Sequence, residues 1–335
     1  MRIWCKPMFG ALALVLLMPC SSRAAAAPPA KIVVTFGGLN ERSGVLFVAK
    51  DAGIFQKHGL DADVVGVRSG PVGMAALAAG ETQFHGGSAT GASIGAMASG
   101  LDLVFLAGLI NKLDGLFVVA PSIRSPADLK GKKIGVQSIG GGAWMFAMLA
   151  FDHWGLNPER DNIQFRVIGD QSVTAQALAT GGIIDGAYLG YTFGPQLERQ
   201  GFRVLRVLGD LLKMGIPFQG LGIMGRRSFV DRSPDVVERT LRAMVETVRF
   251  INNPENKATV IRSLVRTLRL QKAEDAEPGY EMMKTLYDRR IYPNVEGLRH
   301  VIRLLGKSNE QIRKLRAEDL IDDRVVRKLE KEGLF

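Results

Sequence analysis

Short apolar runs alternate with glycine-rich loops and helix-patterned segments through the first two thirds of the chain. Each apolar run is bounded by glycine or polar residues, which predicts strands at Lys31–Phe36, Asp63–Val67, Thr82–His85 and Leu101–Ala107. The segments between them predict helices at Ser43–Asp51, Val72–Ala79 and Ser88–Ser99. Because strands and helices alternate, we expect a mostly parallel sheet with helices on its faces.

The same order of elements recurs about 100 residues later. A shift of 101 residues lays Leu77-Ala78 and Gly80 on Leu178-Ala179 and Gly181, and the same shift lays Val33 on Ile134. A period of this length is the size of a domain, not of a solenoid repeat. The pattern therefore predicts two similar α/β lobes.

The most distinct strand–loop–helix unit is Ser125–Trp154. A short strand ends at Val136, the loop Gln137–Gly142 has almost no side chains, and the helix Ala143–Trp154 follows. A strand that enters a helix through such a loop leaves free backbone N–H groups facing an open space. We expect this unit to form one half of a cleft, with Phe36–Ser43 of the first lobe as the other half.

Two extended segments and a helical region complete the organisation. Asp114–Pro121 and Pro217–Met224 flank the second lobe and predict a hinge of two crossing strands. The last third has apolar residues at helical spacing, as at Val237, Leu241 and Met244. The predicted division is a signal peptide at 1–27, a first lobe of 28–118 and 219–335 with C-terminal helices, and a second lobe of 119–218.

The first 27 residues have the pattern of a secretory signal peptide. Basic residues precede an apolar run at Phe9–Met18, and small residues up to Ala27 offer a cleavage site. We therefore expect a periplasmic protein. Both cysteines, Cys5 and Cys20, lie in this leader, so cleavage would remove every disulfide, thiol nucleophile and cysteine–metal site. A lipid anchor at Cys20 stays open as the alternative, although Met18 and Pro19 are poor residues before a lipidated cysteine.

Composition and motifs argue against nucleic-acid binding and catalysis. The net charge is +10, but no cluster interleaves Lys or Arg with aromatic residues, so we expect a solvated basic surface. The chain has no phosphate-binding loop and no H-E-x-x-H motif. Gly86–Thr90 departs from a nucleophile elbow because Thr90 stands where the second glycine belongs. We predict no catalytic residue, no metal site and no cofactor.

Strand-to-helix loops in both halves of the chain are the candidates for a ligand-binding site. In open α/β sheets, ligands bind beyond the carboxyl ends of strands, and helix N-termini favour anions. Loops of this kind are expected at Gly37–Ser43, Arg68–Pro71, Gly86–Thr90, Gln137–Gly142, Gly169–Ser172 and Tyr188–Gly194.

Several motifs resemble one known family. They are Leu46–Phe55 with His58–Asp63, Ala76–Gly80, Ser125–Val136, Gly155–Pro158, Ala177–Gly181 and Ile184–Ala187. They are similar to those of the periplasmic substrate-binding proteins of ABC importers, in the group that binds nitrate, sulfonates, taurine and thiamine-pyrimidine precursors. The resemblance implies a type II periplasmic-binding-protein fold that captures its ligand by lobe closure. It also implies an ABC permease and its ATPase as partners, and we expect a monomer.

The resemblance and the loop positions together give the candidate ligand-binding residues. They are Gly38, Asn40, Arg42, Ser69, Ser88, Thr90, Ser138, Gly140, Gly141, Asp170 and Tyr188. Alternatives stay open for three of them. Asp170 either holds a ligand amine or caps the next helix, Arg42 either meets an anion or is solvated, and Tyr188 either stacks on a ring or packs.

The predicted function is a receptor that delivers a small, anionic or heterocyclic solute to an ABC importer. A sensory protein that presents its ligand to a membrane receptor is the first alternative. The second is an enzyme like the thiamine-pyrimidine synthases of this fold. Those enzymes carry a cysteine-rich motif, which the mature chain lacks.

Overall fold

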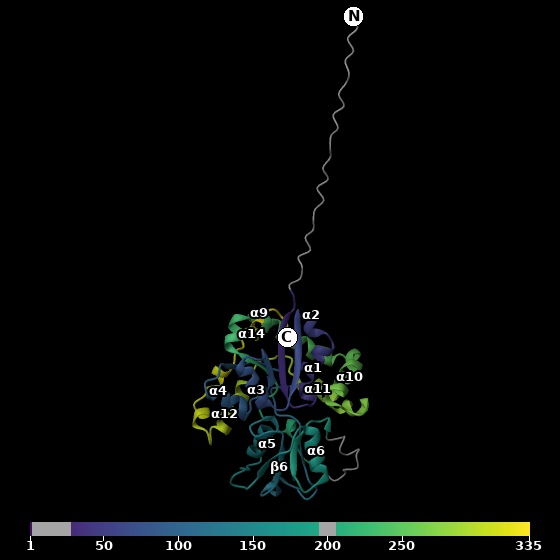
Figure 1. The fold of residues 1–335 in the computed structure, drawn as a ribbon. Coiled ribbons are helices and arrows are strands. Elements are labelled where there is room, and N and C mark those ends of the chain that lie inside the picture. Colours follow the sequence, from purple (N-terminus) through teal and green to yellow (C-terminus); the bar gives the residue numbers. More distant parts are fainter. Residues whose placement is uncertain (2–27, 194–205) are drawn as a thin grey trace.

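The computed structural model describes residues 1, 28–193 and 206–335. The predicted signal peptide, apart from Met1, lies outside the described residues. Figure 1 shows two lobes, with α5, β6 and α6 in the second. None of the helices in the described residues is long and apolar enough to cross a membrane.

The first lobe is built on a five-stranded sheet. Its strands are β1 (Ala30–Gly37), β2 (Leu60–Val67), β3 (Phe84–Gly87), β4 (Leu103–Gly108) and β10 (Gly222–Arg226), in the order β2-β1-β3-β10-β4. β1 pairs in parallel with β2 and β3, whereas β10 runs antiparallel between β3 and β4. The predicted parallel strands are confirmed, and the chain returns from the second lobe to add the antiparallel one.

The second lobe repeats this plan. Its strands are β5 (Leu116–Val119), β6 (Lys133–Val136), β7 (Gln164–Val167), β8 (Gly186–Leu189) and β9 (Arg206–Asp210), in the order β7-β6-β8-β5-β9. Here β5 is the antiparallel strand beside β8. The helices α3 (Gly70–Ala79) and α6 (Gln171–Thr180) are related by the shift of 101 residues found in the sequence. The predicted repeat is therefore a structural one.

Helices cover the sheets and make up most of the last third. Those of the first lobe besides α3 are α1 (Gly44–Asp51), α2 (Ile54–Lys57), α4 (Gly91–Ala98), α8 (Arg227–Arg232), α9 (Pro234–Asn252), α10 (Lys257–Leu268), α11 (Glu277–Leu286), α12 (Val295–Leu305), α13 (Glu310–Arg313) and α14 (Arg324–Lys331). The second lobe has α5 (Gly142–His153) beside α6. Short 3₁₀ turns are η1 (Glu41–Ser43), η2 (Pro126–Leu129), η3 (Leu211–Met214), η4 (Pro254–Asn256), η5 (Ala273–Ala276) and η6 (Ala317–Leu320).

The chain crosses between the lobes twice, and the two crossings lie side by side. Lys112 and Pro217 form an antiparallel bridge, and the Leu113 N–H donates to the Ile216 carbonyl at 3.2 Å. The expected two-strand hinge is confirmed, but it lies just before or at the start of the predicted segments Asp114–Pro121 and Pro217–Met224, which contain β5 and the first residues of β10. The exact division at 118 and 218 stays a prediction, and we note that all of β5 (Leu116–Val119) pairs within the second sheet.

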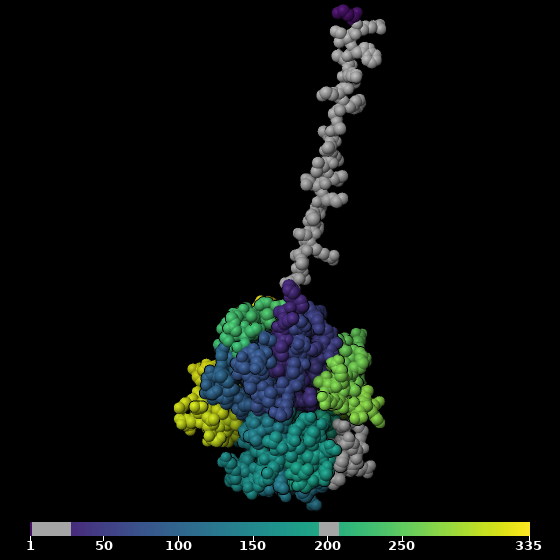
Figure 2. All heavy atoms as spheres, in the orientation of Figure 1, coloured from purple at the N-terminus to yellow at the C-terminus, as the bar shows by residue number. Residues whose placement is uncertain are grey.

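The two lobes meet through both apolar and polar contacts. The ring of Phe146 on α5 lies edge-on to that of Phe218 at the hinge, with centroids 5.3 Å apart. The Ala92 N–H at the start of α4 donates to the Gly140 carbonyl at 2.9 Å. On the face shown in Figure 2 the atoms of the two lobes touch directly. The structure is therefore that of the closed arrangement.

Candidate ligand site between the lobes

A small cavity lies where the predicted loops of the two lobes meet. Its volume is about 50 Å³. Of the predicted site residues, those that line it are Gly38, Asn40, Arg42, Ser88, Thr90 and Tyr188. The first residues of three helices also line it, namely Gly70 of α3, Gly142 of α5 and Gln171 of α6. Three helix N-termini therefore meet at one space, although Asp170 already accepts from two N–H groups of α6.

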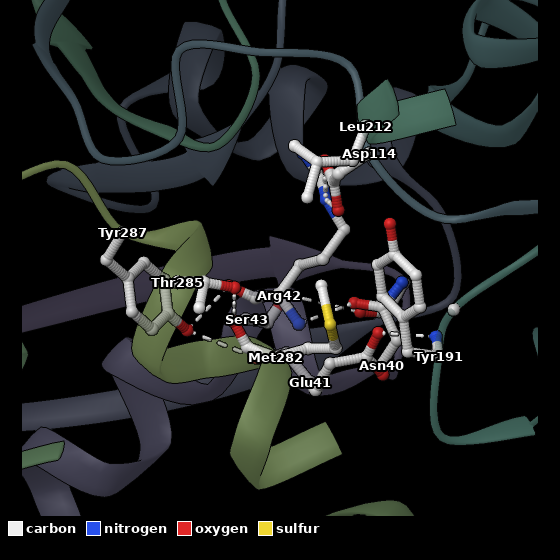
Figure 3. A network of polar contacts seen from close by, with 12 residues as sticks. Asn40, Glu41, Arg42, Ser43, Asp114, Tyr191, Leu212, Met282, Thr285 and Tyr287 are labelled. Carbon is white, nitrogen blue, oxygen red and sulfur yellow. Dashed lines mark hydrogen bonds and ion pairs between the residues drawn. The ribbon is translucent and has the colours of Figure 1, made fainter. Parts of the chain in front are cut away.

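Arg42 is the one side chain with a full charge among the residues that line this cavity. It is 7% exposed, and its Nε donates to both carboxylate oxygens of Asp114, at 2.9 and 2.8 Å (Figure 3). Its guanidinium carbon lies 4.6 Å from the centre of the Phe146 ring. Its Nη2 atom is buried and has no hydrogen-bond partner among the described residues. Arg42 is thus not the solvated side chain that the sequence left open, and it keeps one unused donor group.

Arg42 and Asp114 are both buried, and burial is the largest influence on the pKa of each. Burial raises the pKa of the Asp114 carboxyl to about 6, and the positive charge of Arg42 opposes this rise. Burial alone lowers the pKa of Arg42, but the interaction with Asp114 outweighs it and the net pKa is raised. At neutral pH both groups are charged, and the pair adds no net charge to the site.

Tyr188 and His85 line the cavity as neutral side chains. Burial raises the pKa of Tyr188 well above its ordinary value, and its hydroxyl has no partner among the described residues. Its ring meets Phe146 edge-on at 4.6 Å, so Tyr188 packs within the protein. Burial lowers the pKa of His85 to about 4, while its Nδ1 lies 3.0 Å from Thr35 Oγ1. His85 is therefore uncharged at neutral pH.

The other predicted site residues lie outside the cavity lining, and local structure explains why. The Asp170 carboxylate accepts hydrogen bonds from the N–H groups of Ser172 and Val173, so it caps α6. Gly140 contacts α4 through its carbonyl. Gly141 and Ser138 face each other, because a Cβ at Gly141 would lie 2.4 Å from Ser138 Oγ. Ser69 is buried just before α3.

Gln137, Phe146 and Gln171 are among the lining residues that were missing from the predicted set. Gln137 stands in the predicted glycine loop, and its amide Nε2 donates to the Arg68 carbonyl across the lobes. Phe146 and Gln171 lie on helices, where apolar spacing and a first-turn position gave no sign of a ligand. The signal that could have found Gln171 is its place inside the predicted loop Gly169–Ser172. Within the described residues, no group of three or more His, Cys, Asp or Glu could hold a metal ion.

Comparison with known proteins agrees with this geometry. Residues 40–257 match the family model described as NMT1/THI5 like. The chain belongs to the NMT1/THI5-like family. The match spans both lobes and the hinge, and it includes every loop that lines the cavity except the first glycines, Gly37 and Gly38. The family resemblance seen in the sequence is confirmed.

Individual relatives have low sequence identity to this chain but match it over long stretches. The chain is 28% identical over 182 residues to the taurine-binding periplasmic protein of Escherichia coli, which is 54% of each protein. It superposes on the alkanesulfonate-binding protein SsuA of Xanthomonas axonopodis with a TM-score of 0.70 and 18% identity, covering 89% of this chain and 100% of that one. The nitrate-binding protein NrtA of Synechocystis gives a TM-score of 0.70 and 15% identity, covering 91% and 89%. These structures share the periplasmic-binding-protein fold with this protein.

Proposed function

We propose that the protein is a periplasmic receptor that binds a small anionic solute between its lobes and delivers it to an ABC importer. The observation that carries the proposal is the cavity, which Arg42 lines and at which three helices begin. Free backbone N–H groups at a helix start need an acceptor, and a ligand in the cavity would supply one. Helix N-termini favour negative charge on that acceptor.

The size of the cavity supports a compact anionic group. A cavity needs about 10–15 Å³ to hold one water molecule, and this one has about 50 Å³, so it can hold only a small group. A nitrate-like ion or the head group of a sulfonate or carboxylate suits this space better than a ring with substituents. The relatives that are named for taurine, alkanesulfonate and nitrate point to the same chemical class.

The proposed location and partners rest on the relatives and on the leader pattern. A signal peptide at 1–27 would export the chain, and an importer's permease and ATPase would receive the solute. We propose no catalytic step, because the lining residues hold no nucleophile paired with a base: Ser88 and Thr90 have no hydrogen bond to His85.

Thermal denaturation with candidate solutes tests the binding function. Nitrate, short sulfonates, carboxylates and pyrimidines are compared at equal concentration, and calorimetry gives the stoichiometry. An anion at a hundredfold excess over its Kd stabilises the folded protein by about 2.7 kcal/mol. Stabilisation by pyrimidines alone would contradict the anionic class, and conversion of a bound compound would contradict the receptor.

Ser88→Ala ties binding to the cavity. Ser88 lines it, and a hydrogen bond from its hydroxyl to a charged ligand contributes enough that its loss weakens binding by about tenfold. Ser99→Ala is the matched control, because Ser99 follows α4 and donates to the Ala96 carbonyl outside the cavity. Equal affinity of the two variants would place the ligand elsewhere.

A further inference from the structure

The Glu41 side chain crosses from the first lobe to the second. Its Oε1 accepts a hydrogen bond from the Tyr191 N–H at 2.8 Å (Figure 3), and its Oε2 accepts one from Thr192 Oγ1 at 2.8 Å. Glu41 and Thr192 are both fully buried. Both donors, the Tyr191 N–H and the Thr192 hydroxyl, belong to the second lobe. Glu41 does not line the cavity, so its contacts are separate from those proposed for the solute.

The second lobe is shaped to receive this carboxylate. Gly190 directly follows β8, and a Cβ there would lie 2.8 and 2.9 Å from the two Glu41 oxygens. Only glycine leaves room for the carboxylate at that position. The Gly190 N–H donates to Gln171 Oε1 at 2.8 Å, which holds the segment in place against α6. The segment Gly190–Thr192 is therefore a small, preformed carboxylate site.

The first lobe holds Glu41 just as firmly. Asn40 caps η1 by accepting a hydrogen bond from the Arg42 N–H at 3.2 Å. The Tyr287 hydroxyl, at the end of α11, lies 3.1 Å from the Glu41 carbonyl and 3.0 Å from the Arg42 carbonyl. It also accepts from the Val45 N–H at 3.0 Å. Each half of the contact is thus held by hydrogen bonds within its own lobe.

We propose that Glu41 is an internal carboxylate ligand of the second lobe, which holds the cleft closed in the absence of a solute. A buried carboxylate is tolerated when its oxygens are hydrogen-bonded, and these hydrogen bonds form only while the lobes touch. Solute affinity is proportional to the fraction of protein in the binding-competent state. The effect of the Glu41 contact on solute affinity rests on the proposed solute-binding function, whereas its effect on lobe closure does not.

Small-angle scattering of the solute-free protein tests the proposal. Glu41→Ala removes the carboxylate, and we expect a larger radius of gyration and a change in fluorescence of Trp144, whose ring touches the first lobe at Gly91. Sodium formate should restore the compact form by occupying the vacated site, and sodium chloride at equal ionic strength should not. Glu81→Ala, at an exposed glutamate of the first lobe, is the matched control and should stay compact.

Thr192→Val supplies an independent test that keeps the side-chain shape. It removes the hydroxyl donor, so it should open the solute-free protein in part. Its effect and that of Glu41→Ala should not add in the double variant, because each removes the same contact. An unchanged radius of gyration in Glu41→Ala, or additive effects of the two changes, would overturn the proposal. Neither result depends on whether a solute is found.

Discussion

At the scale of single residues, His85 makes stability depend on pH while it stays neutral at the cavity wall. Burial lowers its pKa from 6.5 to about 4. The unfolded chain therefore binds a proton at a higher pH than the folded protein does. The stabilisation is complete above pH 6.5 and is lost as the pH falls towards 4. The difference between the two pKa values corresponds to about 3 kcal/mol.

His85→Gln isolates this effect. The free energy of unfolding of the variant and of the original protein is measured in urea from about pH 7 to about pH 4.5. The gap between the two proteins should shrink by about 2.5 kcal/mol over this range, because only the original protein loses the contribution of a neutral imidazole. His153→Gln, at an exposed histidine, is the matched control. A constant gap for His85→Gln would show that His85 is solvated.

The sequence predicted which residues stand in the loops better than it predicted their partners. Arg42 and Tyr188 were expected at the site, and both line the cavity. The partner of Arg42 is Asp114, 72 residues away, and the two meet only because the hinge segment passes the first loop. Asp170 shows the opposite case. Asp170 caps α6 by accepting from the Ser172 and Val173 N–H groups, which is a local pattern. Helix capping was one of the two roles that the sequence left open for it.

At the scale of elements, the start of α4 is packed against the glycine loop of the second lobe. A Cβ at Gly91 would lie 3.1 Å from both Gly140 Cα and Trp144 Cζ3. Gly91→Val should therefore hold the lobes apart and weaken solute binding by roughly tenfold, since closure is part of the affinity. Gly95→Val on the same helix is the control, because a Cβ there meets nothing within 4 Å.

The two variants share the same change in helix propensity, so a difference between them reports the contact between lobes. Valine is a better helix former than glycine, and neither change should unfold α4. Solute affinity by calorimetry and the radius of gyration by scattering are the measurements. If Gly91→Val binds as tightly as Gly95→Val, the lobes do not close onto Gly140.

Periodicity was enough to predict the parallel strands and the helices, because each depends on residues close together in the sequence. The repeat was predicted for the same reason, since two copies of one local pattern are visible side by side. The positions of β5 and β10 in the sheets were not predicted. Each is a short apolar segment whose antiparallel neighbours lie more than 60 residues away, as for Leu116 and Leu189. Only the hinge crossing determines that pairing.

At the scale of the whole molecule, a charged contact on the outside complements the buried one at Glu41. Asp152 on α5 lies 2.9 Å from Lys307 Nζ and 3.6 Å from His300 Nε2, and both partners belong to the first lobe. The Lys307 side chain is 61% exposed, so water and salt screen this pair. Exposed pairs contribute about 0–1 kcal/mol, whereas the Glu41 hydrogen bonds are fully buried.

Closure should therefore resist salt. At about 1 M sodium chloride the Debye length is about 3 Å, which removes most of the attraction between exposed charges. We expect the radius of gyration of the solute-free protein to stay the same between low and high salt, and Asp152→Asn to leave it unchanged at either. Expansion at high salt, matched by Asp152→Asn at low salt, would mean that the outer pair holds the lobes together. The buried carboxylate at Glu41 would then only add stability to a closure determined at the surface.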